Sequence, residues 1–145
     1  PQLFHPDTFP VFNAYFEKGR YYGFPIYGIP GFKIGRYHHL EEVTDPDHVH
    51  REITVEDEQI LRLAAGKYFP DGNGNVMTMK TCLFTNTPDE HFIIDTLPNY
   101  PQVAIAAGFS GHGFKFSSVV GEILGDLVID GKTDHDIDLL KFGRF

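Results

Sequence analysis

The chain has 145 residues, of which 41% are hydrophobic, and this is enough to bury the core of about one domain. A formal net charge of -8 and the absence of a basic stripe argue against a nucleic-acid partner, and no apolar run approaches the length that spans a membrane. A single cysteine, Cys82, excludes an internal disulfide framework and favours a reducing, cytoplasmic location.

The amino-terminal part is rich in aromatic residues, glycine and proline, which is typical of short strands joined by turns. Its pattern predicts an antiparallel meander of strands over residues 9–16, 20–24 and 32–36. Thr54, followed three residues later by Asp57, predicts a capped helix start, and Pro70 predicts its end.

The second half of the chain is organised around residues 103–131. Before them, strands are predicted over residues 76–85 and 91–97. Residues 103–107 form a short apolar run, a glycine-rich turn follows, and apolar residues then recur at helical spacing until Gly131. This is the pattern of a strand, a loop and a helix.

These elements predict one compact α+β unit over residues 1–145. We expect a mixed, mainly antiparallel sheet of about six strands, covered by two helices and ending in the strand–loop–helix unit.

The glycine-rich loop lies at the start of the predicted helix, where unpaired N–H groups and a partial positive charge favour an anionic or electron-rich ligand. Lys115 adds a full positive charge there. The spacing of Gly108, Gly111 and Gly113 fits neither a dinucleotide fingerprint nor a phosphate loop, and His112 interrupts a nucleophile elbow at Ser110. The alternative is a tight turn between a strand and its helix.

Several motifs together are similar to one known family, in order and in spacing, over nearly the whole chain. They are Tyr21-Tyr22-Gly23-Phe24-Pro25, Gly31-Phe32-Lys33-Ile34-Gly35, Thr81-Cys82-Leu83-Phe84-Thr85, Asp89-Glu90-His91-Phe92-Ile93-Ile94-Asp95 and Gly108-Phe109-Ser110-Gly111-His112-Gly113-Phe114-Lys115. The sequence resembles the monomeric sarcosine oxidase and N-methyltryptophan oxidase family, within the glycine/D-amino-acid oxidase superfamily.

The resemblance implies a flavoprotein oxidase with FAD as oxidant, an N-methyl or secondary amino acid as substrate, and oxygen reduced to hydrogen peroxide. It also implies a carboxyl-terminal part only, because the glycine motif of the FAD-binding Rossmann strand does not occur in this chain. We therefore expect this chain alone to be inactive, with the missing FAD-binding half as a partner or with self-association through an exposed apolar surface.

For the cofactor, the resemblance implies that Cys82 forms a thioether to the 8α-methyl group of the flavin. A nearby cation favours the thiolate, and Lys80, two residues back on a strand, would share its face. Lys33 matches the lysine that activates oxygen at the flavin. The plainer alternatives are a small buried strand cysteine and an exposed lysine.

The resemblance also assigns substrate contacts and a flavin-facing loop. Lys115 matches a lysine that binds the substrate carboxylate, Tyr22 lines the substrate pocket with a catalytic role, and Phe84 lies beside the substrate. The residues expected to face the flavin are Gly111, His112, Gly113, Phe114 and Lys115. For Tyr22, an ordinary aromatic residue of a sheet is the alternative.

Three positions depart from the family. Phe84 stands where sarcosine oxidase has a tyrosine, Tyr37 where relatives carry a histidine, and Asn13 where sarcosine oxidase has a methionine. These changes concentrate at the substrate side and put sarcosine itself in doubt as the substrate.

Other functions have weaker support from the residues. The histidines of residues 38–50 match no zinc template, so no metal is expected, and a Ser110–His112–Asp95 hydrolase lacks the elbow that it needs. The remaining alternatives to an oxidase are a truncated domain without turnover, acting as an interaction module, and a small-ligand or anion-binding module that uses residues 108–115 without flavin.

Overall fold

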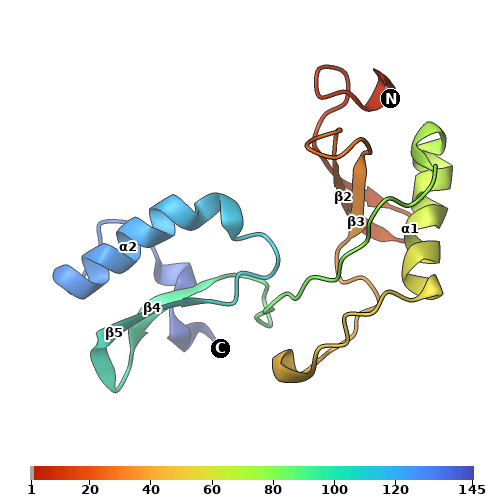
Figure 1. Ribbon diagram of the computed structural model, residues 1–145. Coiled ribbons are helices and arrows are strands. Elements are labelled where there is room, and N and C mark those ends of the chain that lie inside the picture. Colours follow the sequence, from red (N-terminus) through yellow and green to blue (C-terminus); the bar gives the residue numbers. More distant parts are fainter. Residues whose placement is uncertain (1) are drawn as a thin grey trace. The chain divides into compact units, whose positions relative to one another are not determined.

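The computed structural model describes residues 2–145 and divides the chain into two compact units. The first ends at Cys82 and the second begins at Leu83. Figure 1 shows a small sheet and one long helix in each unit.

The first unit contains a three-stranded antiparallel sheet of β1 (Phe12–Phe16), β2 (Gly19–Phe24) and β3 (Lys33–Arg36), in the order β1-β2-β3. Side chains alternate between the two faces of such a sheet, and directly paired residues share a face. Asn13 pairs with Tyr22, and Tyr22 pairs with Gly35. Odd and even positions of β2 therefore face opposite sides.

One face of this sheet packs against α1 (Val55–Tyr68). Thr54 and Asp57 form the predicted capping box at the start of the helix. At its other end, Tyr68 stacks on Phe16 with ring centroids 3.9 Å apart, and Tyr21 on the same face is only 1% exposed. Aromatic burial thus holds α1 to the inner face of the sheet.

The second unit pairs β4 (Ile93–Leu97) with β5 (Tyr100–Ala107) in an antiparallel ribbon, covered by α2 (Ser117–Ile129) (Figure 1). The stripe predicted for the helix supplies its buried face. The core of the unit consists of Phe92, Ile94, Val120, Ile123, Leu127 and Ile137. Ile137 comes from the segment after α2, so this segment returns to the core of the unit.

The α+β class and the two helices are confirmed, but about six strands in one sheet are not. Residues 2–145 form five strands in two separate sheets. Residues 76–85, predicted as a strand, form none, because no strand among residues 2–145 pairs with them. The strand predicted over residues 91–97 begins at Ile93. That residues 1–145 act as one domain stays a prediction.

Within residues 2–145, no helix has the length and apolar character needed to cross a membrane.

Candidate functional site

Two of the candidate residues lie on the face of the first sheet that points away from α1, which we call the outer face. It carries Asn13, Tyr15, Arg20, Tyr22, Phe24 and Lys33. The Lys33 ammonium lies 5.5 Å from the ring centroid of Tyr22 and 5.4 Å from that of Phe24. The structure therefore brings Lys33 and Tyr22 together on one face of the sheet.

Gly35 makes room for the Tyr22 ring. A Cβ atom at Gly35 would lie 2.5 Å from Cζ of Tyr22 and 2.6 Å from its hydroxyl oxygen, closer than real contacts allow. The ring can lie across β3 only because residue 35 has no side chain.

Burial raises the pKa of the Tyr22 phenol, and the nearby Cys82 and Tyr37 raise it further. At neutral pH the phenol is therefore protonated and can donate a hydrogen bond. The same effect shows that the Cys82 thiol lies within electrostatic range of this phenol. Cys82 is exposed, so its sulfur is accessible for chemistry, and the buried strand cysteine of the alternative interpretation is wrong.

Sequence reasoning missed Arg20, which lies on the same outer face. Its guanidinium carbon is 4.3 Å from the centroid of the Tyr37 ring, and its Nε donates to Oδ1 of Asn13 over 2.9 Å. The alternation of side chains along β2 could have found it, because Arg20 and Tyr22 are two residues apart on one strand.

The other candidate residues belong to the glycine-rich loop between β5 and α2 in the second unit. Gly108, Ser110 and Gly111 have left-handed backbone conformations, with φ of 63°, 47° and 75°. A Cβ atom at Gly111 would lie 2.6–2.8 Å from ring atoms of Phe84. Phe84, predicted as a substrate contact, therefore packs directly against the loop at Gly111 and limits how the loop backbone can move toward it.

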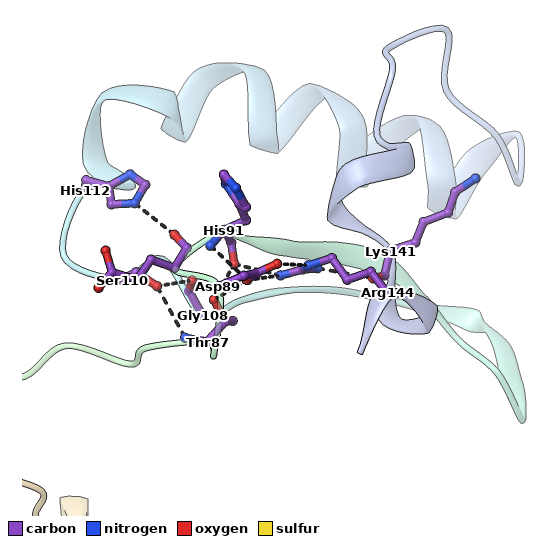
Figure 2. A network of polar contacts seen from close by, with 9 residues as sticks. Thr87, Asp89, His91, Gly108, Ser110, His112, Lys141 and Arg144 are labelled. Carbon is purple, nitrogen blue, oxygen red and sulfur yellow. Dashed lines mark hydrogen bonds and ion pairs between the residues drawn. The ribbon is translucent and has the colours of Figure 1, made fainter.

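Ser110 fixes the strained centre of this loop. It is 3% exposed, its N–H donates to the Thr85 carbonyl over 3.1 Å, and its hydroxyl donates to the Gly108 carbonyl over 3.1 Å. The Thr87 N–H donates to the same hydroxyl oxygen (Figure 2). Ser110 is thus a structural residue that maintains a non-glycine left-handed conformation.

The loop presents donors where a ligand could approach. Within residues 2–145, the backbone N–H groups of Gly111 and Gly113 donate no hydrogen bond, and α2 starts without a side-chain cap. Phe114 is 95% exposed beside them. The Lys115 ammonium is exposed and donates to the His112 carbonyl over 2.9 Å. Unpaired donors, a cation and an exposed ring suit an anionic or electron-rich planar ligand.

The His112 ring is held from two sides. Its Nε2 lies 3.1 Å from the Glu90 carbonyl oxygen (Figure 2). Its ring centroid lies 4.9 Å from that of Phe92. Because a carbonyl only accepts hydrogen bonds, Nε2 carries the proton, and Nδ1 of the neutral ring is left as an acceptor. The contact fixes both the tautomer and the orientation of the ring.

The turn that carries the Glu90 carbonyl is fastened to the carboxyl-terminal tail. Nε of Arg144 donates to Oδ2 of Asp89 over 2.7 Å, and Nη2 donates to the His91 carbonyl over 2.8 Å (Figure 2). The hydrogen bond from the Arg144 guanidinium is the main cause that holds the pKa of the Asp89 carboxyl far below its usual range. The hydrogen bonds from the His91 N–H and the Thr87 hydroxyl lower this pKa by less. Arg144, 55 positions from Asp89 and 53 from His91, thus stabilises the turn whose Glu90 carbonyl holds the His112 ring.

The hydrolase alternative is not supported by this geometry. The Ser110 hydroxyl donates to Gly108 and the His112 ring to Glu90, while the Asp95 carboxylate accepts the N–H groups of Thr96 and Phe142. A catalytic triad needs these three side chains bonded in series. Across residues 2–145, there is also no group of three or more His, Cys, Asp or Glu side chains that could hold a metal ion.

Comparison with known proteins places these residues in context. The family model described as FAD dependent oxidoreductase matches residues 2–127. The monomeric sarcosine oxidase of Bacillus sp. (strain NS-129) is 51% identical over 94% of this chain and 35% of its own length, and that of Arthrobacter sp. (strain TE1826) is 49% identical over the same shares. The N-methyl-L-tryptophan oxidase of Escherichia coli (strain K12 / DH10B) is 35% identical over 96% of this chain and 37% of its own length. The chain spans about a third of the length of the curated relatives that it matches.

Proposed function

Because the chain belongs to the family of FAD-dependent oxidoreductases, we propose that it is the carboxyl-terminal, substrate-side portion of an oxidase of N-methyl or secondary amino acids. The proposed reaction transfers a hydride equivalent from a carbon next to the substrate nitrogen, which leaves an imine. Dioxygen takes the two electrons and yields hydrogen peroxide.

The observation that carries this proposal is the 51% identity to a monomeric sarcosine oxidase over 94% of the chain. Relatives named for two different N-methyl amino acids match over nearly the same part of the chain. Oxidation of an N-methyl amino acid is what their names have in common, so we propose this substrate class and not one particular amine.

The chemistry of the donors suits FAD, which supplies an electron-accepting ring when bound. The N–H groups of Gly111 and Gly113 can donate to the carbonyl-rich pyrimidine edge of that ring, and the start of α2 favours the negative charge of its reduced form. The exposed Cys82 thiol can form the thioether to the 8α-methyl group, in which a C–S bond replaces a C–H bond and dioxygen takes the two electrons. Phe114 and Lys115 complete the proposed cofactor contacts of the loop.

In the first unit, we assign Lys33 to oxygen activation. Its ammonium is exposed on the outer face beside the Tyr22 and Phe24 rings, and no carboxylate of residues 2–145 forms an ion pair with it. A fixed cation with no anionic partner can stabilise the negative charge that develops on oxygen as it is reduced. The protonated Tyr22 phenol adds an apolar wall with one hydrogen-bond donor for the substrate.

In the second unit, we assign Lys115 to the substrate carboxylate and His112 to the face of the loop that meets the ligand. The ammonium has three donors and uses one on the His112 carbonyl, so two are left for a carboxylate. In the neutral form of the His112 ring, Nδ1 is the acceptor that could hold the substrate amine proton. Phe84 packs against this loop at Gly111, so we expect it to affect the substrate indirectly, through the position of the loop.

The test is peroxide formation by the flavin-loaded protein, this chain together with the segment that completes the FAD site, with a panel of N-methyl amino acids. Lys33→Met should lower the rate of flavin reoxidation by oxygen about 100-fold, while substrate reduces the flavin at an unchanged rate. Lys18→Met, at an exposed lysine in the β1–β2 turn, is the matched control and should keep both rates. Equal reoxidation rates in both variants would contradict the role of Lys33, and no peroxide with any member of the panel would contradict the function.

The unpaired N–H groups of Gly111 and Gly113 also favour a second candidate, an anion-binding or interaction module without turnover. It differs from the oxidase in one measurable respect, because its ligand binding would survive the replacement of Cys82.

A further inference from the structure

The outer face of the first sheet carries an unbroken row of two cations and two aromatic rings. The Lys33 ammonium contacts the Tyr22 ring, which meets the Tyr37 ring edge to face at 5.2 Å. The Arg20 guanidinium carbon lies 4.3 Å from the centroid of the Tyr37 ring. Asn13 fixes the far end of the row through its hydrogen bond from Arg20. The row starts at the proposed catalytic Lys33 and ends at a second positive charge.

Contacts within the sheet hold the Arg20 guanidinium in place and leave its two terminal nitrogens, Nη1 and Nη2, available for a ligand. Its Nε is committed to Asn13, and its planar face is committed to the rings of Tyr37 and Tyr15. In the described residues 2–145, neither Nη1 nor Nη2 of Arg20 donates a hydrogen bond, and no carboxylate pairs with it. A stacked guanidinium loses little further entropy on binding, and its two terminal nitrogens match the two oxygens of a carboxylate.

We propose that Arg20 recognises a second carboxylate of the substrate, so that the preferred substrates are N-methylated acidic amino acids. This inference rests on the proposed function and narrows its substrate class. The α-carboxylate is bonded to the carbon next to the amine, so a substrate whose amine lies over the Tyr22 phenol reaches Arg20, two residues away along β2, only with a carboxylate farther out on its side chain.

The spacing along β2 fits such a substrate. Arg20 and Tyr22 are two residues apart on one face, so their Cα atoms are about 7 Å apart along the strand. A substrate whose amine lies over the Tyr22 phenol can then extend a short acidic side chain along Tyr37 toward Arg20. A neutral substrate would leave the guanidinium without a partner, which costs nothing because it is half-exposed, so neutral substrates should still react.

The experiment compares kcat/KM of the flavin-loaded protein for N-methyl-aspartate and N-methyl-glutamate with that for sarcosine and N-methyl-alanine. Arg20→Gln should lower kcat/KM for the acidic substrates about tenfold or more, mainly through KM, and leave the neutral substrates within about twofold. Arg20→Lys keeps the positive charge but lacks the paired terminal nitrogens of arginine, so its kcat/KM for the acidic substrates should lie between those of wild type and Arg20→Gln. Arg51→Gln, at an exposed arginine of the same unit, is the matched control and should change neither class.

A binding readout that does not depend on turnover accompanies the rates. Titration with glutarate should perturb the flavin absorbance at concentrations about tenfold lower than butyrate, and Arg20→Gln should abolish this difference.

Two outcomes would overturn the inference. One is equal kcat/KM of the wild-type protein for acidic and neutral substrates, and the other is an equal loss of kcat/KM for both classes in Arg20→Gln. Either result leaves the oxidase function standing. A flavin-loaded protein that oxidises no N-methyl amino acid refutes the proposed function instead. In that case the glutarate titration alone decides whether Arg20 binds a carboxylate.

Discussion

Replacement of Gly111 by alanine should distort the loop that we propose faces the flavin. An alanine at φ 75° costs about 1–2 kcal/mol, because the left-handed region brings Cβ against the backbone. The new Cβ would also lie 2.6–2.8 Å from three atoms of the Phe84 ring, and forcing a packed ring aside costs about 1–3 kcal/mol. Together these effects destabilise the second unit by about 3 kcal/mol, and its Tm should fall by about 12–24 °C.

The assay is thermal unfolding followed by circular dichroism, with Gly125→Ala as the matched control. Gly125 lies in α2 and a Cβ atom there meets nothing within 4 Å, so alanine should stabilise the helix by about 0.5–1 kcal/mol. Gly111→Ala should also weaken the retention of flavin, whereas Gly125→Ala should not. If Gly111→Ala unfolded at the wild-type temperature, the close contact with Phe84 and the strained loop would both be refuted.

Two further predictions concern the supports of the two units. Because the folded-state pKa of Asp89 is lowered from 3.8, its stabilising effect is complete above pH 4 and is lost as pH falls below that value. In urea titrations, Asp89→Asn should therefore be less stable than wild type at pH 7, and its free energy of unfolding should fall less steeply toward acid pH. Parallel curves of stability against pH for wild type and variant would contradict this. Thr54→Ala removes the hydroxyl that accepts the Asp57 N–H at the start of α1 and should cost about 1 kcal/mol in urea unfolding, and an unchanged midpoint would mean that the cap contributes nothing.

Features that depend on neighbouring residues in the sequence could be predicted well. The Thr54–Asp57 capping box involves positions three apart, and the α2 stripe repeats every three or four residues, so both are visible in the sequence itself. The meander was found for the same reason, because Gly19 marks the turn that fixes the register of β1 and β2.

Features that depend on distant residues could not be predicted. The sequence of residues 76–85 predicts a strand, but a strand needs a partner, and one segment by itself does not say whether a partner exists. The Arg144–Asp89 contact joins positions 55 apart, and the Glu90 carbonyl that fixes the His112 tautomer is a backbone group with no signature in the sequence.

For the candidate site, the sequence identified Tyr22 and Lys33, and the structure adds Arg20 to the same face. Arg20 lies outside the motifs that resemble the oxidase family, so a search by resemblance passes over it, whereas the period of two along β2 includes it. The roles of all these residues stay predictions until a cofactor-loaded protein is measured.

The most direct test of the central claim is the intact mass and visible spectrum of the purified flavoprotein, before and after denaturation, with Cys82→Ala alongside. The proposed function predicts that the mass of this segment includes a covalently attached flavin, that the yellow colour stays with the denatured polypeptide, and that Cys82→Ala loses both. A flavin released on denaturation of the wild-type protein would contradict the thioether at Cys82. A colourless protein of unmodified mass would contradict the account that these residues hold a flavin.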